Sequence, residues 1–376
     1  MNGSGKHNNW SLSTPEMGSL FSPGKTPHSN LVFLTFLASV IQAVDKHADL
    51  LRASISKAGN DHRLGAQEAP PAIISIFLGD QLADIIEQIK AGGAKSSAEK
   101  TTMELGVDVL PVLPKDTTDR NRTSPFAFTG NKFEFRAVGS SQTCAWPMAV
   151  LNTIMCETLE EVADKLEPVV GTPEFNSTVA TLIKDMITAH DRVVFNGNGY
   201  SDEWIAEAER RGLPHIHTTP EALEVLSRPD TIALMSKYNV LSEGELLARK
   251  EIQVESYEKV IDIEAKTCLN MLQTIYLPAV AAQMTEICAT VAAIKSAGIS
   301  AGLKAATAKA EAVGTLYDEL PGKVEALQAS IEKGDPAAVR SAMVSARETV
   351  DALEAIVDAD LWPVPTYAQM LNIHSK

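Results

Sequence analysis

Aromatic residues make up only 5% of this 376-residue chain, and its four cysteines include no Cys-x-x-Cys pair. That cysteine usage argues against a disulfide framework or a cysteine-based zinc site, and it is typical of reduced thiols in a cytoplasmic protein. Long hydrophobic runs are also lacking: the longest, residues 31–44, is too short to span a bilayer and contains Gln42. We therefore expect a buried helix there, no membrane segment and no signal peptide.

Basic residues are outnumbered, with 33 Lys and Arg against 48 Asp and Glu and a net charge of −15. An acidic chain of this kind is not expected to bind nucleic acid or an anionic membrane. Because 45% of the residues are hydrophobic and 22% are charged, the chain can bury a large core. Its length predicts two or more domains.

A glycine-broken loop, Asn-Gly-Ser-Gly-Lys-His-Asn-Asn-Trp-Ser, occupies residues 2–11 and carries His7 and Ser11. Glycines let a backbone pass close to a ligand and turn its amides toward an anion. The loop differs from a Walker loop, because Gly5 and Lys6 are followed by a histidine instead of Ser or Thr. It is therefore a candidate ligand loop of another kind.

A second polar stretch, residues 119–136, carries four cations. At its end Phe133 and Phe135 alternate with Lys132, Glu134 and Arg136, which predicts a strand with the three charged side chains on one face. A solvated face with a local ion pair is the ordinary explanation for such a strand. The alternative is that the carboxylate holds a metal while the neighbouring cations hold anions.

Together these two stretches resemble the glutamine synthetase family. Residues 2–11 are similar to the end of its ATP-region signature. Residues 121–136 are similar to its substrate and metal region, and their sequence resembles the large type III branch in particular. Between them, Glu68-Ala69-Pro70 resembles the family's mobile flap, although Glu68 could also be a solvated loop carboxylate. The resemblance implies an α+β fold: a partial catalytic domain at 1–258, with an antiparallel active-site sheet backed by helices, and a helical domain at 259–376.

The implied activity is glutamate–ammonia ligation, in which ATP drives formation of glutamine from glutamate and ammonia through γ-glutamyl phosphate. ATP and Mg²⁺ or Mn²⁺ are the implied cofactors, and a homo-oligomeric ring in the cytoplasm is the implied assembly. Matching the motifs residue by residue gives four groups: metal ligands His7 and Glu134; catalytic residues Glu68 and Arg122; substrate-binding residues Asn2, Gly3, Arg63 and Arg136; and nucleotide-binding residues Ser11, Lys132 and Arg122.

The chain departs from the family pattern at several positions. Ala127 occupies a place where many members have an arginine, and Asn9 occupies the place of the residue that stacks on adenine, so that the neighbouring Trp10 is an alternative. The chain is also expected to begin inside the catalytic domain, without the amino-terminal β-grasp domain and most metal-binding glutamates. Two hypotheses follow. The chain is part of a ligase, or it is a non-catalytic fragment or interaction subunit that needs an amino-terminal partner.

Helical periodicity and capping residues predict most of the remaining structure. We expect strands at 73–78 and 107–113, and a turn at His215 and His217 before a helix that starts near Pro220. Either Ser29 or Asn30, Ser201, and the pair Ser242 and Glu245 are expected to cap helices. The predicted helices are 30–58, 82–90, 148–166, 242–296 with a kink at Pro278, 301–320 and 336–358.

Overall fold

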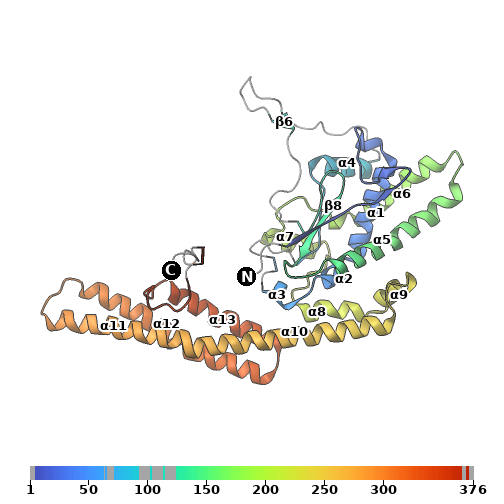
Figure 1. Cartoon of the computed structure of the whole chain (residues 1–376). Helices are drawn as coiled ribbons and strands as arrows, with labels where there is room; N and C mark the ends of the chain where they lie inside the picture. The colour runs from blue at the N-terminus through green and yellow to red at the C-terminus, as the bar shows by residue number, and fades with distance from the viewer. Residues whose placement is uncertain are drawn as a thin grey trace. The chain divides into compact units, whose positions relative to one another are not determined.

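The computed structural model of the chain describes residues 5–62, 64–65, 72–92, 124–365 and 370–371, together with the backbone of 102–103 and 113–114. The chain divides into two compact units, Met1–Val254 and Glu255–Lys376. The sequence prediction placed a domain boundary after residue 258. Figure 1 shows a small sheet among helices in the first unit and antiparallel helices in the second, which is an α+β fold as predicted.

The main sheet of the first unit has the strand order β1-β8-β7-β4. Strand β1 (Lys6–Trp10) pairs antiparallel with β8 (Phe133–Val138), which pairs antiparallel with β7 (Phe126–Phe128). Strand β4 (Ile76–Phe77) joins β7 in parallel, so the sheet is mixed. The predicted strand at 73–78 thus contributes only two residues to the sheet.

Two short strand pairs complete the β structure in the described part of the chain. Strand β2 (Ser13–Thr14) pairs with β3 (Gly18–Ser19), and β5 (Thr102–Met103) pairs with β6 (Leu113–Pro114). The predicted strand at 107–113 lies almost entirely outside the described residues.

One face of the main sheet is aromatic. Phe133 is fully buried, and its ring stacks on Phe126 with centroids 5.0 Å apart and meets Phe21 edge-on at 5.2 Å. Helix α1 (Leu31–Lys46) reaches this face through Phe33, whose ring lies 5.8 Å from that of Phe128. The predicted alternation of β8 is thereby confirmed, because its phenylalanines point into the core and its charged residues lie on the other face.

Helix α1 begins where the sequence predicts and ends earlier. The side chain of Asn30 accepts a hydrogen bond from Phe33 N at 3.1 Å, so it caps the helix as expected. The prediction of one helix over 30–58 is wrong, because α1 and α2 (Ala48–Ser54) form a bent pair at 74°. His47 separates them in a non-helical conformation, and its Nε2 lies 2.7 Å from Glu157 Oε2.

Two of the other helices of the first unit, α4 (Asp80–Lys90) and α5 (Ala145–Leu166), lie within three residues of the predicted bounds 82–90 and 148–166. Ser201 caps α7 as expected, since its hydroxyl accepts a hydrogen bond from Trp204 N at 3.2 Å. Short 3₁₀ turns η1 (Pro27–Ser29), η2 (Glu167–Val169), η3 (Asp191–Val193) and η4 (Glu224–Ser227) link the helices. The helices are α3 (Ala58–Asp61), α4 (Asp80–Lys90), α5 (Ala145–Leu166), α6 (Phe175–His190), α7 (Asp202–Arg210), α8 (Thr219–Leu223) and α9 (Pro229–Lys237).

A long helix crosses from the first unit into the second. Helix α10 (Glu243–Met271) begins with the predicted capping box: Ser242 N donates to Glu245 Oε2 at 2.8 Å, and Glu245 N donates to Ser242 Oγ at 3.4 Å. It continues through the π-helical turn η5 (Leu272–Tyr276) into α11 (Leu277–Ser296). The irregular turn lies directly before Pro278, because proline lacks the N–H that a regular helix needs there.

Two further helices complete the second unit: α12 packs on α11, and α13 packs on α12 (Figure 1). Helix α12 (Leu303–Lys333) was predicted to end at residue 320, and it continues through Pro321 for another three turns or so. Helix α13 (Pro336–Glu354) is capped by Asp335, whose carboxylate accepts from Ala337 N at 3.0 Å. The prediction of a helical carboxy-terminal region therefore holds for the described residues.

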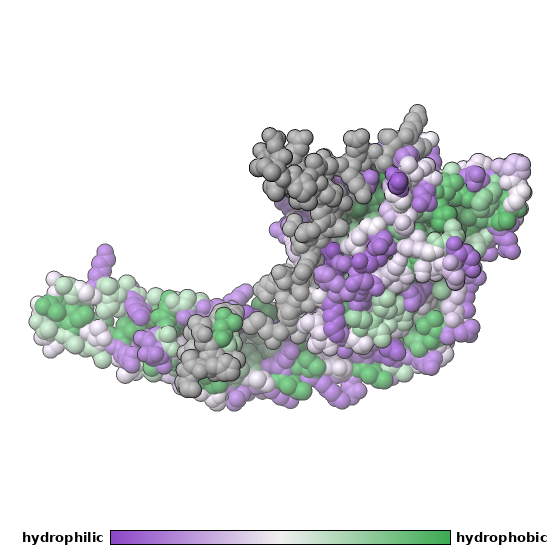
Figure 2. All heavy atoms as spheres, turned by 45° about the horizontal axis from the view of Figure 1, so that its top comes forward, coloured by the Kyte–Doolittle hydropathy of each residue, from purple (hydrophilic) through white to green (hydrophobic). Residues whose placement is uncertain are grey.

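The continuous helix 243–296 exposes much of its apolar surface. It contains an 18-residue window that is long and apolar enough to cross a membrane, of which only 17% is buried. Length and composition alone are weak evidence for a span, and the bent pair of α1 and α2 passes the same test while lying largely in the core. Figure 2 shows hydrophobic and hydrophilic residues interspersed on the visible face of the second unit.

Candidate functional site

Strand pairing brings His7 and Glu134 together on the open face of the main sheet. Asn9 lies opposite Glu134 in the register of β1 and β8, and a bulge between Lys6 and Asn8 shifts His7 toward the same carboxylate. His7 Nδ1 lies 3.5 Å from Glu134 Oε2, with the side chains 27% and 19% exposed. The predicted pair is therefore adjacent, and a small cation could reach both side chains.

Arg136 lies two residues further along β8, on the same face as Glu134. Its Nε and Nη2 both lie 3.1 Å from Glu134 Oε2, and its side chain is 7% exposed. The carboxylate thus fixes the guanidinium in place. In the part of the chain that the structure describes, Glu134 Oε1 accepts no hydrogen bond, which leaves this oxygen available to a ligand.

Two of the three predicted nucleotide-binding residues lie close to the turn between β7 and β8. The Ser11 hydroxyl donates to the carbonyl oxygen of Asn131 at 3.3 Å, and Asn131 directly precedes Lys132. The carbonyl of Lys132 accepts from Thr129 N at 2.8 Å and closes the turn. The structure therefore places Ser11 and Lys132 at one end of the sheet.

Trp10 does not share the open face. Its side chain is 5% exposed, its ring lies 5.4 Å from that of Phe21, and its Nε1 donates to Asn152 Oδ1 at 2.9 Å. The expectation that Trp10 could replace a missing adenine-stacking residue is wrong, because the indole is packed in the hydrophobic core. Asn9 is the exposed residue at this end of β1.

Gly5 is required by a close approach of two backbones. A Cβ at this position would lie 2.3 Å from the carbonyl oxygen of Arg136 and 3.1 Å from that of Val138. The absence of a side chain lets the beginning of β1 lie against β8, which in turn places His7 next to Glu134. Gly5 therefore has a structural role, because it allows the strand pairing that the site requires.

Sequence reasoning missed a link made by Gln142. Lys6 Nζ donates to the carbonyl of Gln142 at 2.5 Å, and the side-chain amide of Gln142 accepts from Gly139 N at 2.8 Å and donates to Ile55 O at 3.0 Å. These bonds tie the ends of β1 and β8 to the residue that follows α2. No local pattern signals this role, since its partners are distant in sequence.

Five predicted site residues lie outside the described part of the chain: Asn2, Gly3, Arg63, Glu68 and Arg122. Among the residues that are described, no group of three or more His, Cys, Asp or Glu side chains could hold a metal ion. His7 and Glu134 offer an imidazole and a carboxylate, a donor set that Mn²⁺ or Mg²⁺ accepts when further oxygens complete it. The donor chemistry fits a divalent cation and supplies only part of its shell.

His215 and His217 are a second pair of potential ligands. Their ring centroids lie 3.8 Å apart, and His215 Nδ1 is 3.6 Å from Glu209 Oε1. Burial, followed by the neighbouring His217, lowers the pKa of His215. The two histidines lie in an irregular segment before α8, whose cap is Thr218, so the predicted helix start near Pro220 is confirmed, whereas the structure has no turn at the histidines themselves.

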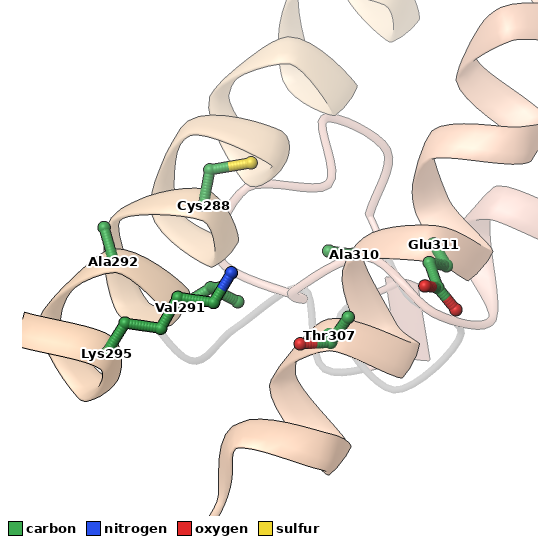
Figure 3. A pocket seen from close by; sticks show the side chains of 7 residues that line it. All are labelled: Cys288, Val291, Ala292, Lys295, Thr307, Ala310 and Glu311. Carbon is green, nitrogen blue, oxygen red and sulfur yellow. The ribbon is translucent and has the colours of Figure 1, made fainter. Parts of the chain in front are cut away.

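The second unit contains a pocket of about 400 Å³ between α11 and α12 (Figure 3). Its lining is mostly small or apolar, with one lysine and one glutamate: Cys288, Val291, Ala292, Lys295, Thr307, Ala310 and Glu311. The four cysteines of the chain are all free thiols, as expected from their spacing. This pocket offers neither the donor set of a metal site nor a cluster of cations for a nucleotide.

Comparison with known proteins agrees with the motifs. Residues 178–295 match the glutamine synthetase C-terminal domain. Across 99% of its length the chain is 44% identical to the type-3 glutamine synthetase of Dictyostelium discoideum, 39% identical to a glutamine synthetase of Bacteroides fragilis and 37% identical to one of Butyrivibrio fibrisolvens. The chain spans about half the length of these relatives, covering 53%, 54% and 54% of them respectively.

Proposed function

We propose, because the chain belongs to the glutamine synthetase family, that it supplies part of the active site of an ATP-dependent glutamate–ammonia ligase. In this reaction ATP converts the side-chain carboxylate of glutamate into γ-glutamyl phosphate, and ammonia then displaces phosphate to give glutamine. The observation that carries the proposal is the placement of His7, Glu134 and Arg136 on one open face of the sheet.

The reaction requires dense positive charge, because the triphosphate and the carboxylates of glutamate must lie close together. His7 and Glu134 would hold one divalent ion, Mg²⁺ or Mn²⁺, which when bound neutralises phosphate charge. Both side chains are partly exposed and adjacent, so they need little rearrangement to share a cation. The remaining ligands must come from outside the described residues.

Arg136 is suited to binding an oxyanion of glutamate or of the transferred phosphate. A guanidinium forms paired hydrogen bonds with carboxylate or phosphate oxygens. Glu134 orients Arg136 through one hydrogen bond and one ion-pair contact, both of 3.1 Å, so the arginine is held in place before the substrate arrives. A cation that draws Glu134 away from Arg136 would change how the guanidinium is held, which couples the two binding events.

The remaining roles follow from the family motifs. Ser11 and Lys132, at the turn between β7 and β8, would lie beside the nucleotide. Arg122 would stabilise the transferred phosphoryl group, and Glu68 would cover the acyl phosphate, exclude water and accept a proton from ammonium. The other proposed glutamate contacts are Asn2, Gly3 and Arg63. We also propose a homo-oligomeric ring in the cytoplasm as the working assembly.

Reconstitution tests this function. The chain is co-expressed with the amino-terminal half of the type-3 relative from Dictyostelium, and ATP-dependent formation of γ-glutamyl hydroxamate from glutamate and hydroxylamine is measured with Mn²⁺. We expect activity that Glu134→Gln abolishes and that Glu203→Gln, on the exposed face of α7, leaves unchanged. Full activity in Glu134→Gln contradicts the proposal.

A non-catalytic fragment or interaction subunit is the second candidate. It is favoured by the lack of a three-ligand metal cluster among the described residues. Metal-dependent nucleotide binding without hydroxamate formation, in the reconstituted protein, would support this candidate. Hydroxamate formation would exclude it.

A further inference from the structure

The glycine loop of residues 2–11 contains one lysine, Lys6, that the proposed ligase site does not use. A lysine in a glycine-rich loop is commonly a phosphate ligand. In this structure the Lys6 ammonium donates to the carbonyl oxygen of Gln142, and in the described part of the chain this is its only hydrogen bond. Lys6 therefore has a partner within the fold, in the turn that follows β8.

Strand alternation separates Lys6 from the face that carries the proposed metal pair. Successive side chains of a strand point to opposite faces. Lys6 therefore shares a face of β1 with Asn8 and Trp10, both of which are buried. His7 lies on the other face, beside Glu134. A ligand held by His7 is thus across the sheet from the lysine side chain, which argues against a shared phosphate.

The ladder of β1 and β8 is irregular next to Lys6. Lys6 pairs with Val138, and Asn8 pairs with Phe135. His7 therefore faces two residues of β8 across a bulge, where the normal pairing is interrupted. The direction of its imidazole depends on how β1 is held on both sides of this bulge, and Lys6 holds the amino-terminal side.

Gln142 is a well-held partner for this purpose. Its N–H donates to Gly139 O at 2.9 Å and closes a turn, while its side chain accepts from Gly139 N at 2.8 Å and donates to Ile55 O at 3.0 Å. Asn60 of α3 donates to Gln142 Oε1 at 3.3 Å and to Ile55 O at 2.8 Å. The carbonyl that Lys6 contacts is thereby tied to α3 and to the end of α2.

We infer that Lys6 is a positioning residue for the pair of His7 and Glu134, and that it acts by tying β1 to Gln142. The inference rests on the proposed function, in which this pair binds a divalent cation. Without the ammonium, the amino-terminal side of the bulge is held by backbone pairing alone, so His7 is less well oriented and the cation binds less tightly. The purely electrostatic effect has the opposite sign, because removing a positive charge favours a nearby cation.

Mn²⁺ titration of the full chain, followed by electron paramagnetic resonance, tests the inference. We expect Lys6→Met to weaken Mn²⁺ binding about tenfold, the lower end of the loss caused by removing a group that orients a metal ligand. Lys6→Arg, which keeps a long cationic donor, should retain most of the affinity. Lys25→Met removes an exposed lysine elsewhere in the same unit and should leave the affinity unchanged.

The opposite results are equally specific. Unchanged or tighter Mn²⁺ binding in Lys6→Met overturns the inference, and so does an equal loss in Lys25→Met. Normal Mn²⁺ binding together with weakened ATP binding would identify Lys6 as a phosphate ligand instead.

A His7→Ala background separates positioning from a general loss of structure. In that background the imidazole is missing, so adding Lys6→Met should cause no further loss of Mn²⁺ affinity. A further loss would show that Lys6 acts elsewhere and would overturn the inference. If His7→Ala alone leaves the affinity unchanged, the proposed metal pair fails and the inference with it. If His7→Ala weakens binding and Lys6→Met does not, the inference alone fails.

Discussion

Glu134 Oε2 lies 3.5 Å from His7 Nδ1 and accepts a hydrogen bond of 3.1 Å from Arg136 Nε, while Nη2 of the same guanidinium also lies 3.1 Å away. One carboxylate oxygen therefore serves both a potential metal ligand and a potential anion-binding group. A cation bound by this pair would compete with the guanidinium for Oε2, while Oε1 accepts no hydrogen bond from the described residues. Occupancy by a divalent ion should consequently change how tightly Arg136 is held.

Metal binding is expected to depend on both side chains of the pair. Removing a partner that only orients a metal ligand costs about 10-fold to 100-fold in affinity, so His7→Ala and Glu134→Gln should each weaken Mn²⁺ binding by at least about tenfold. Electron paramagnetic resonance of free Mn²⁺ measures this directly. His217→Ala, which removes an exposed histidine elsewhere in the same unit, is the control. Unchanged affinity in His7→Ala would show that the pair does not bind the ion.

Substitution of Gly5 by alanine should lower the unfolding free energy, whereas the same substitution at a helical glycine should raise it. In Gly5→Ala the new methyl group would meet the Arg136 carbonyl at 2.3 Å, so we expect a loss of about 1–3 kcal/mol in unfolding free energy. In Gly244→Ala nothing lies within 4 Å of the new Cβ, and replacing a helical glycine should stabilise α10 by up to about 1 kcal/mol. Urea denaturation of both variants checks the opposite signs. Equal effects would remove the argument for a close approach at Gly5.

Local signals predicted the parts of this fold that depend on near neighbours. The alternation of Phe133 and Phe135 identified β8 and its charged face, and Asn30, Ser201 and Ser242 identified helix starts. These features succeed because a cap or a pleat involves residues within a few positions. The adjacency of His7 and Glu134 was predicted through the family resemblance, since no local pattern relates residues in different strands.

Other features depend on contacts far apart in the sequence. Periodicity continues across His47, yet the helix bends there, where the imidazole meets Glu157 of α5. Pro321 predicts a helix end, yet α12 continues through it and packs between α11 and α13. In both cases packing outweighs local preference, which a single sequence does not reveal.

The buried pair Arg52 and Asp61 should be sensitive to loss of one partner. Both side chains are at most 1% exposed, and Arg52 Nη2 lies 3.7 Å from Asp61 Oδ1. Asp61→Asn leaves a buried guanidinium without its ion-pair partner, so we expect a loss of about 3–5 kcal/mol in unfolding free energy, measured by urea denaturation. Asp164→Asn, an exposed change on α5, should alter stability by less than about 0.5 kcal/mol.

A double variant separates the charge effect from the loss of other bonds. Asp61 also accepts hydrogen bonds from Thr219 N and Thr219 Oγ1, both at 2.8 Å, which any change of Asp61 disturbs. Adding Arg52→Met to Asp61→Asn removes the unpaired charge and should recover part of the stability. The stability losses of Arg52→Met and of Asp61→Asn, each measured alone, are summed and compared with the loss of the double variant. If the sum equals that loss, the ion pair contributes nothing beyond those other bonds.

Stability should fall in mild acid because of His215. Its pKa lies below the ordinary value of 6.5, since burial and the neighbouring His217 disfavour the charged ring, while Glu209 and Glu221 offset part of that effect. The unfolded chain therefore takes up a proton at higher pH than the folded chain, so the stability associated with neutral His215 is present above pH 6.5 and decreases as pH falls below it.

Comparison of variants isolates this contribution from the other histidines. Urea midpoints at pH 7.5 and 5.5 should show a larger acid-induced loss in the unchanged chain than in His215→Gln, whose side chain does not titrate. His217→Gln should show an intermediate loss, because removing the neighbouring ring takes away one of the causes that lower the pKa of His215 while burial remains. If His215→Gln loses as much stability in acid as the unchanged chain, the adjacent rings of His215 and His217 are not responsible for the acid sensitivity.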